Sequence, residues 1–222
     1  MRELVYMSQA KLDQFQKETS RLDYVPRITS AEYRGVKIET PARSKSIENK
    51  LDKTISHLHK SVKWYSSSDV HTGEWVQFQA LVNYEILHYR SADSDENELL
   101  LLWSVLALDE VTLLLHGSPS NLIEAFGIGA SQPGTLKSLP PSTQLGILSA
   151  LRSLGGDDDR NDLMWQLSKL MKKLRDDVPD SLSSPMGGIA RITAKVKTVE
   201  GAAVVIATPL YVERQPRSEV VD

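Results

Sequence analysis

The pattern of apolar and polar positions is strongest between residues 97 and 127, which read NELLLLWSVLALDEVTLLLHGSPSNLIEAFG. Residues 99–108 and 111–115 are two nearly continuous apolar runs, separated by the acidic pair Asp109 and Glu110. Apolar runs of this length are typical of strands buried on both faces of a sheet, so they predict two central strands. One long buried helix is the alternative, because leucine has no preference for strands and Asp-Glu is a poor hairpin turn.

A strand-to-helix turn is predicted directly after the second run. Gly117 frees the backbone, Ser118 can cap a helix, and Pro119 suits the first helical position. We expect Gly117 to adopt a conformation that side chains disfavour, and a short helix to continue to about Phe126. Such a turn directs backbone N–H groups toward one point where an anion or a partner's carboxylate could bind, although most capped turns are purely structural.

The candidate ligand-binding residues all belong to this turn or are expected to lie near it. His116 stands at a strand end beside a helix start, where a neutral imidazole is favoured and could act as a base or a donor. Tyr6 precedes the predicted helix cap Ser8 and is either a core residue or the floor of a pocket, with the core favoured. The complete candidate set is Tyr6, His116, Gly117, Ser118, Ser120 and Asn121.

Periodicity elsewhere predicts both helices and strands. The clearest helix covers residues 44–63, where apolar residues recur at helical spacing on an otherwise charged segment. Residues 76–86 alternate between apolar and polar side chains, and the polar positions Gln77, Gln79, Asn83 and Glu85 face either solvent or a cavity. The other predicted helices begin at Ser8 and cover 142–155 and 158–176, and the other predicted strands cover 3–7, 33–39, 189–198 and 203–212.

These elements predict an α+β fold in which a mainly antiparallel sheet is covered by helices and ends in a C-terminal β-hairpin. We expect residues 1–212 to form a single domain and residues 213–222 to be a disordered tail. The glycine- and proline-rich segment 127–141 is interpreted as a lid loop or a linker. The acidic residues 157–159 are interpreted as helix-start charge and not as a cation site.

Composition narrows the function classes. The 222 residues are 41% hydrophobic and 25% charged, as in an ordinary soluble globule, and the net charge of -3 gives no general attraction to nucleic acid. Without cysteine there is no disulfide, thiolate metal site or cysteine nucleophile. No apolar run is long enough to span a bilayer, so we expect a cytoplasmic protein that does not bind a membrane, and no strong basic patch gives evidence for nucleic-acid binding.

The chemistry-bearing motifs of common enzymes are absent from the sequence. There is no phosphate-binding glycine loop, no nucleophile elbow around Ser118 and no metal-spaced cluster, and His57 and His59 are too poorly spaced on a helix to chelate one metal. The sequence therefore favours a non-enzymatic binding or adaptor protein with a protein partner and without cofactor or metal. The alternative is a small-molecule or anion sensor, or an enzyme, with a pocket at residues 116–121.

Two segments carry a family resemblance. The N-terminal LVYMSQAKLDQF and the later LLLHGSPSNLIEAFG resemble an uncharacterised family of small actinobacterial proteins, and the likeness extends over most of the chain. Some of these relatives resemble accessory proteins encoded beside bacterial conflict systems. The resemblance implies a sensor or adaptor role in place of catalysis, and it carries over no catalytic residue.

Overall fold

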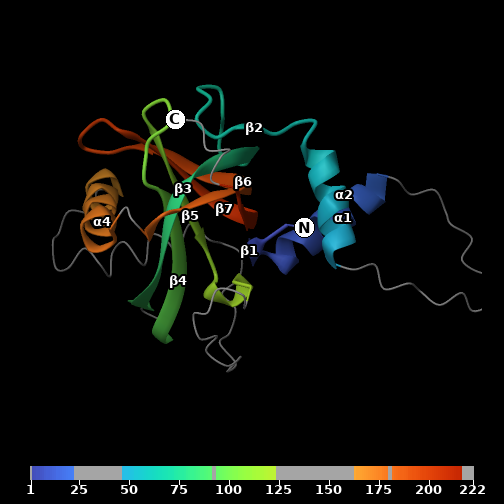
Figure 1. Ribbon diagram of the computed structural model, residues 1–222, viewed down its shortest axis with the longest axis horizontal. Coiled ribbons are helices and arrows are strands. Elements are labelled where there is room, and N and C mark those ends of the chain that lie inside the picture. Colours follow the sequence, from blue (N-terminus) through green and yellow to red (C-terminus); the bar gives the residue numbers. More distant parts are fainter. Residues whose placement is uncertain (1, 23–46, 92–93, 124–162, 180–181, 217–222) are drawn as a thin grey trace, which may run out of the picture. The chain divides into compact units, whose positions relative to one another are not determined.

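The computed structural model describes residues 2–22, 47–91, 94–123, 163–179 and 182–216 (Figure 1). Four sequence predictions lie outside these residues: the strand at 33–39, the loop at 127–141, the helix at 142–155 and the acidic residues 157–159. The described chain divides into two compact units, one of residues 9–60 and the other of residues 1–8 and 61–222. The assignment of residues 1–212 to one domain stays a prediction.

The smaller unit consists of two helices, α1 (Gln9–Leu22) and α2 (Ile47–Leu58). The predicted stripe on α2 is confirmed, because Leu51, Ile55 and Leu58 are buried, although the helix ends before Val62. The two helices are joined by an ion pair between Lys50 and Asp13 at 3.6 Å and by an edge contact between the Phe15 and His57 rings.

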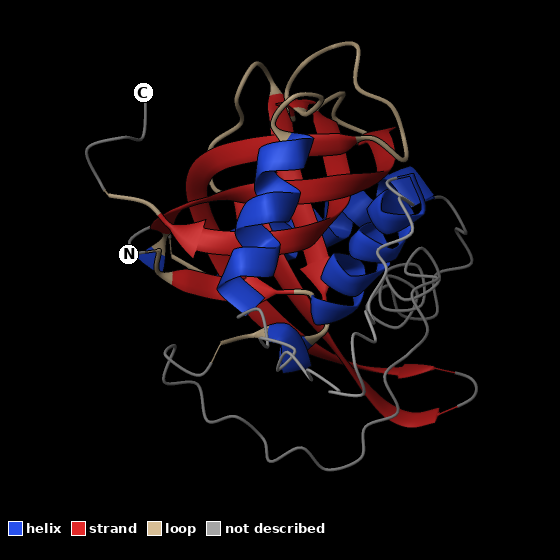
Figure 2. Cartoon of the chain, turned by 90° about the vertical axis from the view of Figure 1, so that its right-hand side faces the viewer, coloured by secondary structure: helices blue, strands red, loops and turns tan. Residues whose placement is uncertain are grey.

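The larger unit is built on a seven-stranded, mainly antiparallel sheet, which confirms the predicted α+β class (Figure 2). Its helix α4 (Leu163–Asp177) and 3₁₀ helix η1 (Pro119–Asn121) both lie between β5 and β6 in the sequence. The strands in chain order are β1 (Leu4–Met7), β2 (Lys63–Trp64), β3 (Trp75–Ser91), β4 (Ser94–Ser104), β5 (Val111–Gly117), β6 (Ser184–Lys197) and β7 (Ala203–Arg214).

Five of these strands form a closed ring. β3 pairs with β4, β4 with β5, β5 with β7, β7 with β6, and β6 returns to β3. Closure requires β3 to change neighbours along its length: residues 75–82 pair with β6, whereas residues 82–91 pair with β4. A five-stranded Greek-key barrel is the architecture of the OB-fold, which hosts many unrelated functions, so the fold alone assigns none.

Alternating residues of the ring enter two separate hydrophobic clusters. One face of β3 and β4 contributes Phe78 and Leu102 to the barrel interior, as the alternation of residues 76–86 predicts. The other face contributes Leu101 and Trp103 to a cluster beneath α4, which packs against the barrel there (Figure 1). The predicted polar side of β3 also faces outward, and Asn83 is buried there opposite its cross-strand neighbour Trp103.

The two central strands are confirmed, with a correction to their ends. β4 begins at Ser94 and ends at Ser104, so residues 105–110 form a turn and do not continue the strand. Asp109 and Glu110 have φ angles of 52° and 63°, and the chain reverses across them. A pair that propensity disfavours for a hairpin therefore forms one, because the strands on either side are fixed by pairing and burial.

The C-terminal hairpin is confirmed and extends further than predicted. Gly201, with φ of 87°, allows the turn between β6 and β7. A register shift between Ile192 and Ala194 moves the apolar positions of β6 from the interior to the outer face, so the predicted simple alternation is broken there. β7 includes Glu213 and Arg214, which the sequence assigns to the tail; residues 217–222 lie outside the described chain.

Candidate functional site

The turn after β5 forms as predicted at its start and differs at its end. Ser118 is extended, with φ of -84° and ψ of 133°, and its Oγ accepts the N–H of Ser120 at 3.4 Å. The helix that follows is a single 3₁₀ turn, because Leu122 is again extended and forms a bridge with Tyr6. Pairing with β1 thus ends the helix well before the predicted Phe126, and residues 124–126 lie outside the described chain.

Gly117 is required for a different reason from the predicted one. The described glycines with a left-handed backbone are Gly73 and Gly201, so Gly117 is not among them. A Cβ atom at Gly117 would instead collide with the Tyr6 hydroxyl and lie 2.9 Å from the Tyr6 Cζ. Glycine is needed here because an aromatic ring passes directly over the backbone.

Tyr6 is a core residue that ties the turn to β1. It is 1% exposed, and its hydroxyl accepts a hydrogen bond from Asn121 Nδ2 at 3.1 Å. Burial raises the pKa of Tyr6, while hydrogen bonds with Asn121 and with the Ser118 backbone act in the opposite direction. The ring therefore occupies the space beside Gly117 that a ligand at this turn would need.

The N–H groups of the turn are also engaged. Those of Asn121 and Leu122 donate to carbonyls of the turn itself at 3.1 and 3.0 Å. The N–H of Ile123 donates to Val5 in β1 at 3.0 Å. The N–H groups that suggested an anion site thus close the turn and attach it to β1, and ligand binding at these residues stays a prediction.

His116 is not brought together with the other candidates. Its neighbour Leu115 lies in the barrel interior with Tyr6, so the side chain of His116 leaves β5 on the opposite face. It is fully buried there, and its Nε2 lies 3.4 Å from Thr193 Oγ1. The structure therefore groups Tyr6, Gly117, Ser118, Ser120 and Asn121, and separates His116 from them.

Sequence reasoning missed two other places. The first is the β4–β5 turn, residues 105–110, where Leu106 and Leu108 are exposed. Its signal in the sequence was the acidic pair Asp109 and Glu110, which interrupts the two apolar runs and has a left-handed backbone in the structure. The second is a hollow between α4 and the β6–β7 turn. Its residues come from segments far apart in the sequence, so no local pattern reveals it.

The described segments contain no group of three or more His, Cys, Asp or Glu side chains placed to hold a metal ion. No helix in the described part of the chain combines the length and the apolar character that crossing a membrane requires.

The closed ring of five strands and the helix α4 packed against it define this chain as an α+β protein with a helix-covered β-barrel. The chain belongs to DUF7019, a family of unknown function whose model matches residues 2–215. The predicted membership of an uncharacterised family is thereby confirmed. Neither a curated protein nor a solved structure matches the chain.

The contact between Gly117 and Tyr6 gives a testable prediction. Gly117→Ala should lower the free energy of unfolding by about 1 to 3 kcal/mol, because the new methyl group overpacks the space under the ring. In a Tyr6→Leu background the same substitution should cost clearly less, since the ring atoms that it meets are gone. Urea unfolding of the four proteins measures this coupling. Equal losses in the two backgrounds would show that the ring does not determine the need for glycine.

Proposed function

We propose that this protein acts by binding another protein, as a non-enzymatic binding or adaptor protein, and that the β4–β5 turn is its contact surface. The supporting observation is the exposure of two leucines on one short turn. Leu106 is 65% exposed and Leu108 is 37% exposed. Isolated exposed leucines are common, but these two directly precede a pair of residues with an unusual backbone conformation.

The backbone of this turn is held in an unfavourable conformation. Leu108 and Val111 exchange both backbone hydrogen bonds, at 3.1 and 2.9 Å, around the left-handed pair Asp109 and Glu110. Two-residue turns of this kind favour Asn-Gly, and non-glycine residues with positive φ cost on the order of 1 kcal/mol or more. Ser66 helps to fix the turn by donating a hydrogen bond to Asp109 Oδ2 at 2.8 Å. Strain that is retained in this way is typical of binding loops.

The chemistry of the turn indicates the kind of partner. Asp109 and Glu110 are exposed beside the two leucines, so the turn presents apolar side chains next to two negative charges. A protein surface with a shallow apolar pocket bordered by lysine or arginine is complementary to it. Opposite charges across such a contact accelerate association and fix its orientation.

The proposal extends to the cellular role of the protein. The resemblance to accessory proteins encoded beside bacterial conflict systems supports a sensor or adaptor of such a system in the bacterial cytoplasm. The alternative function, a ligand site or catalytic pocket at residues 116–121, is supported less well. There Tyr6 fills the space next to Gly117, and His116 lies on the other face of β5.

The experiment compares proteins captured from a native lysate by tagged full-length chains. We expect the wild type to retain one or more proteins. The captured amount of these proteins should fall by about tenfold when Leu106→Ser is combined with Leu108→Ser, the loss typical of removing two apolar anchors. Leu182→Ser is the matched control, because Leu182 is 67% exposed and lies outside this turn. A capture set that is unchanged in the turn variant, or lost equally in the control, would refute the contact surface.

A further inference from the structure

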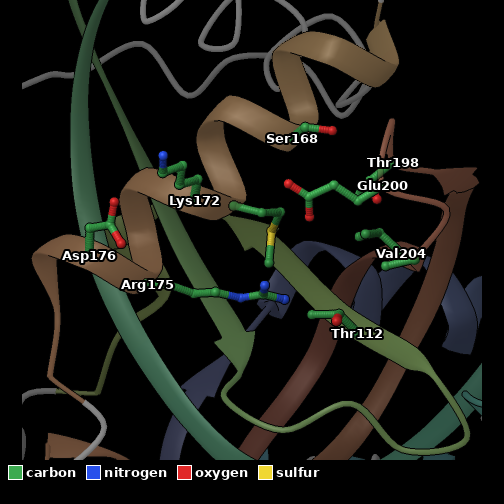
Figure 3. A pocket seen from close by; sticks show the side chains of 10 residues that line it. Thr112, Ser168, Lys172, Arg175, Asp176, Thr198, Glu200 and Val204 are labelled. Atoms are coloured by element: carbon green, nitrogen blue, oxygen red, sulfur yellow. The ribbon is translucent and has the colours of Figure 1, made fainter.

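A hollow of about 290 Å³ lies between α4 and the turn that joins β6 to β7 (Figure 3). α4 contributes Met171 and Arg175, and the turn contributes Thr198 and Glu200. Met171 and Val204 line the hollow with apolar side chains, and both are almost completely buried, at 3% and 1% exposed. The size is at the lower limit of small-molecule sites, so it suits a metabolite and not a peptide or a nucleotide.

Thr198 supplies the first sign of a ligand. Its side chain is 6% exposed and lines the hollow, and its Oγ1 has no hydrogen-bond partner in the described chain. The turn around this side chain is fixed by two backbone bonds, from Thr198 N–H to the Ala202 carbonyl at 2.8 Å and from Gly201 N–H to the Thr198 carbonyl at 2.9 Å. Buried hydroxyls are normally hydrogen-bonded, and rotation about the Cα–Cβ bond can turn this unpaired one toward a group bound in the hollow.

Two opposite charges face the same space. The Arg175 side chain extends from α4 toward Thr112, and the Glu200 carboxylate points in from the β6–β7 turn, whereas Lys172 and Asp176 point away (Figure 3). No ion pair or hydrogen bond joins the side chain of Arg175 or Glu200 to another described residue. Among the described residues the hollow thus has an unpaired guanidinium on one side and an unpaired carboxylate on another.

We propose that this hollow binds a small zwitterion, a free α-amino acid with an aliphatic side chain. Arg175 receives the carboxylate through its planar fork, and the Thr198 hydroxyl adds a hydrogen bond to it. Glu200 accepts from the ammonium group, and Met171 and Val204 contact the aliphatic part. A purely anionic ligand fits less well, because Glu200 repels a second negative charge.

The test is titration of the full-length protein with L-valine, L-leucine and L-methionine, followed by calorimetry or ligand-observed NMR. At least one should bind saturably at millimolar concentration or below. Its amide, which lacks the carboxylate, and its N-acetyl form, which lacks the ammonium, should bind about tenfold more weakly, as should inorganic phosphate.

Variants of the lining residues test which side chains bind the amino acid. Arg175→Gln and Glu200→Gln should each weaken binding of the amino acid by about tenfold. Lys173→Gln is the matched control, since Lys173 is exposed on the same helix and does not line the hollow. Thr198→Val should weaken binding without lowering the melting temperature of the free protein, because it removes a hydroxyl that is unpaired there.

Three results would overturn the proposal: no saturable binding of any of the three amino acids, equal binding of the N-acetyl form, or an equal loss in Lys173→Gln and Arg175→Gln. The hollow and the β4–β5 turn share no residue. Failure of the ligand titrations therefore leaves the capture experiment intact, and the reverse also holds.

Discussion

Replacing Leu101 or Leu114 by alanine should lower the free energy of unfolding by about 2 to 5 kcal/mol, the usual cost of opening a cavity in a core. Both side chains are 0% exposed. They belong to the cluster on the outer face of the barrel, where Leu167 and Leu170 of α4 cover them. Each substitution therefore removes methyl groups both from the sheet face and from its contact with α4.

Chemical unfolding in urea, followed by circular dichroism, measures the loss. Leu106→Ala is the matched control, because it removes the same atoms from a side chain that is 65% exposed, and it should change stability by no more than about 0.5 kcal/mol. Similar losses at Leu106 and Leu114 would contradict the assignment of the outer cluster as a second core.

Alkaline pH should destabilise the protein through two buried tyrosines. Burial raises the pKa of Tyr65 to about 12, and the charge of Asp109 acts in the same direction. Burial, followed by the charge of Glu213, raises the pKa of Tyr211 to about 12. Both values lie above the ordinary value of 10.0, which applies to the unfolded chain.

The sign follows from which state ionises first. Below pH 10 both tyrosines are neutral in both states, and the stability is fully present. Between pH 10 and 12 the unfolded chain loses its phenolic protons while the folded protein keeps them, so stability falls by up to about 2 to 3 kcal/mol for each tyrosine. Urea midpoints measured from pH 9 to 12 should fall steeply for the wild type. The fall should be much shallower for Tyr65→Phe combined with Tyr211→Phe, and an unchanged slope in that variant would assign the effect to other groups.

Elements of the fold were predictable where the signal is local. The apolar runs of β4 and β5, the alternation in β3 and the stripe on α2 each report the surroundings of a single segment. Closure of the barrel was not predictable, because the pairing of β3 with β6 leaves no mark in either strand alone. The register shift beside Thr193 was also hidden, since one extra residue exchanges the two faces without changing the composition of the strand.

The candidate site shows the same limit. Ser118 as a cap and Pro119 at the helix start were predictable from residue type and position. The need for glycine at position 117 was predicted for the wrong reason, because the ring that requires it comes from Tyr6, more than a hundred residues earlier. The hollow gave no signal at all, since Arg175 and Glu200 come to line the same space only after α4 has packed against the barrel.

Closure of the barrel also determines when the protein can fold during synthesis. Residues 75–82 of β3 obtain their partner in β6 only from residues 184–191, more than a hundred positions later in the chain. Pairing across such a separation is slow, because a long loop must be closed before the contacts that stabilise it exist. The ring therefore stays open until β6 and β7 have left the ribosome, and its apolar interior is exposed for most of translation. We expect the nascent chain to depend on chaperones far more than the finished protein does.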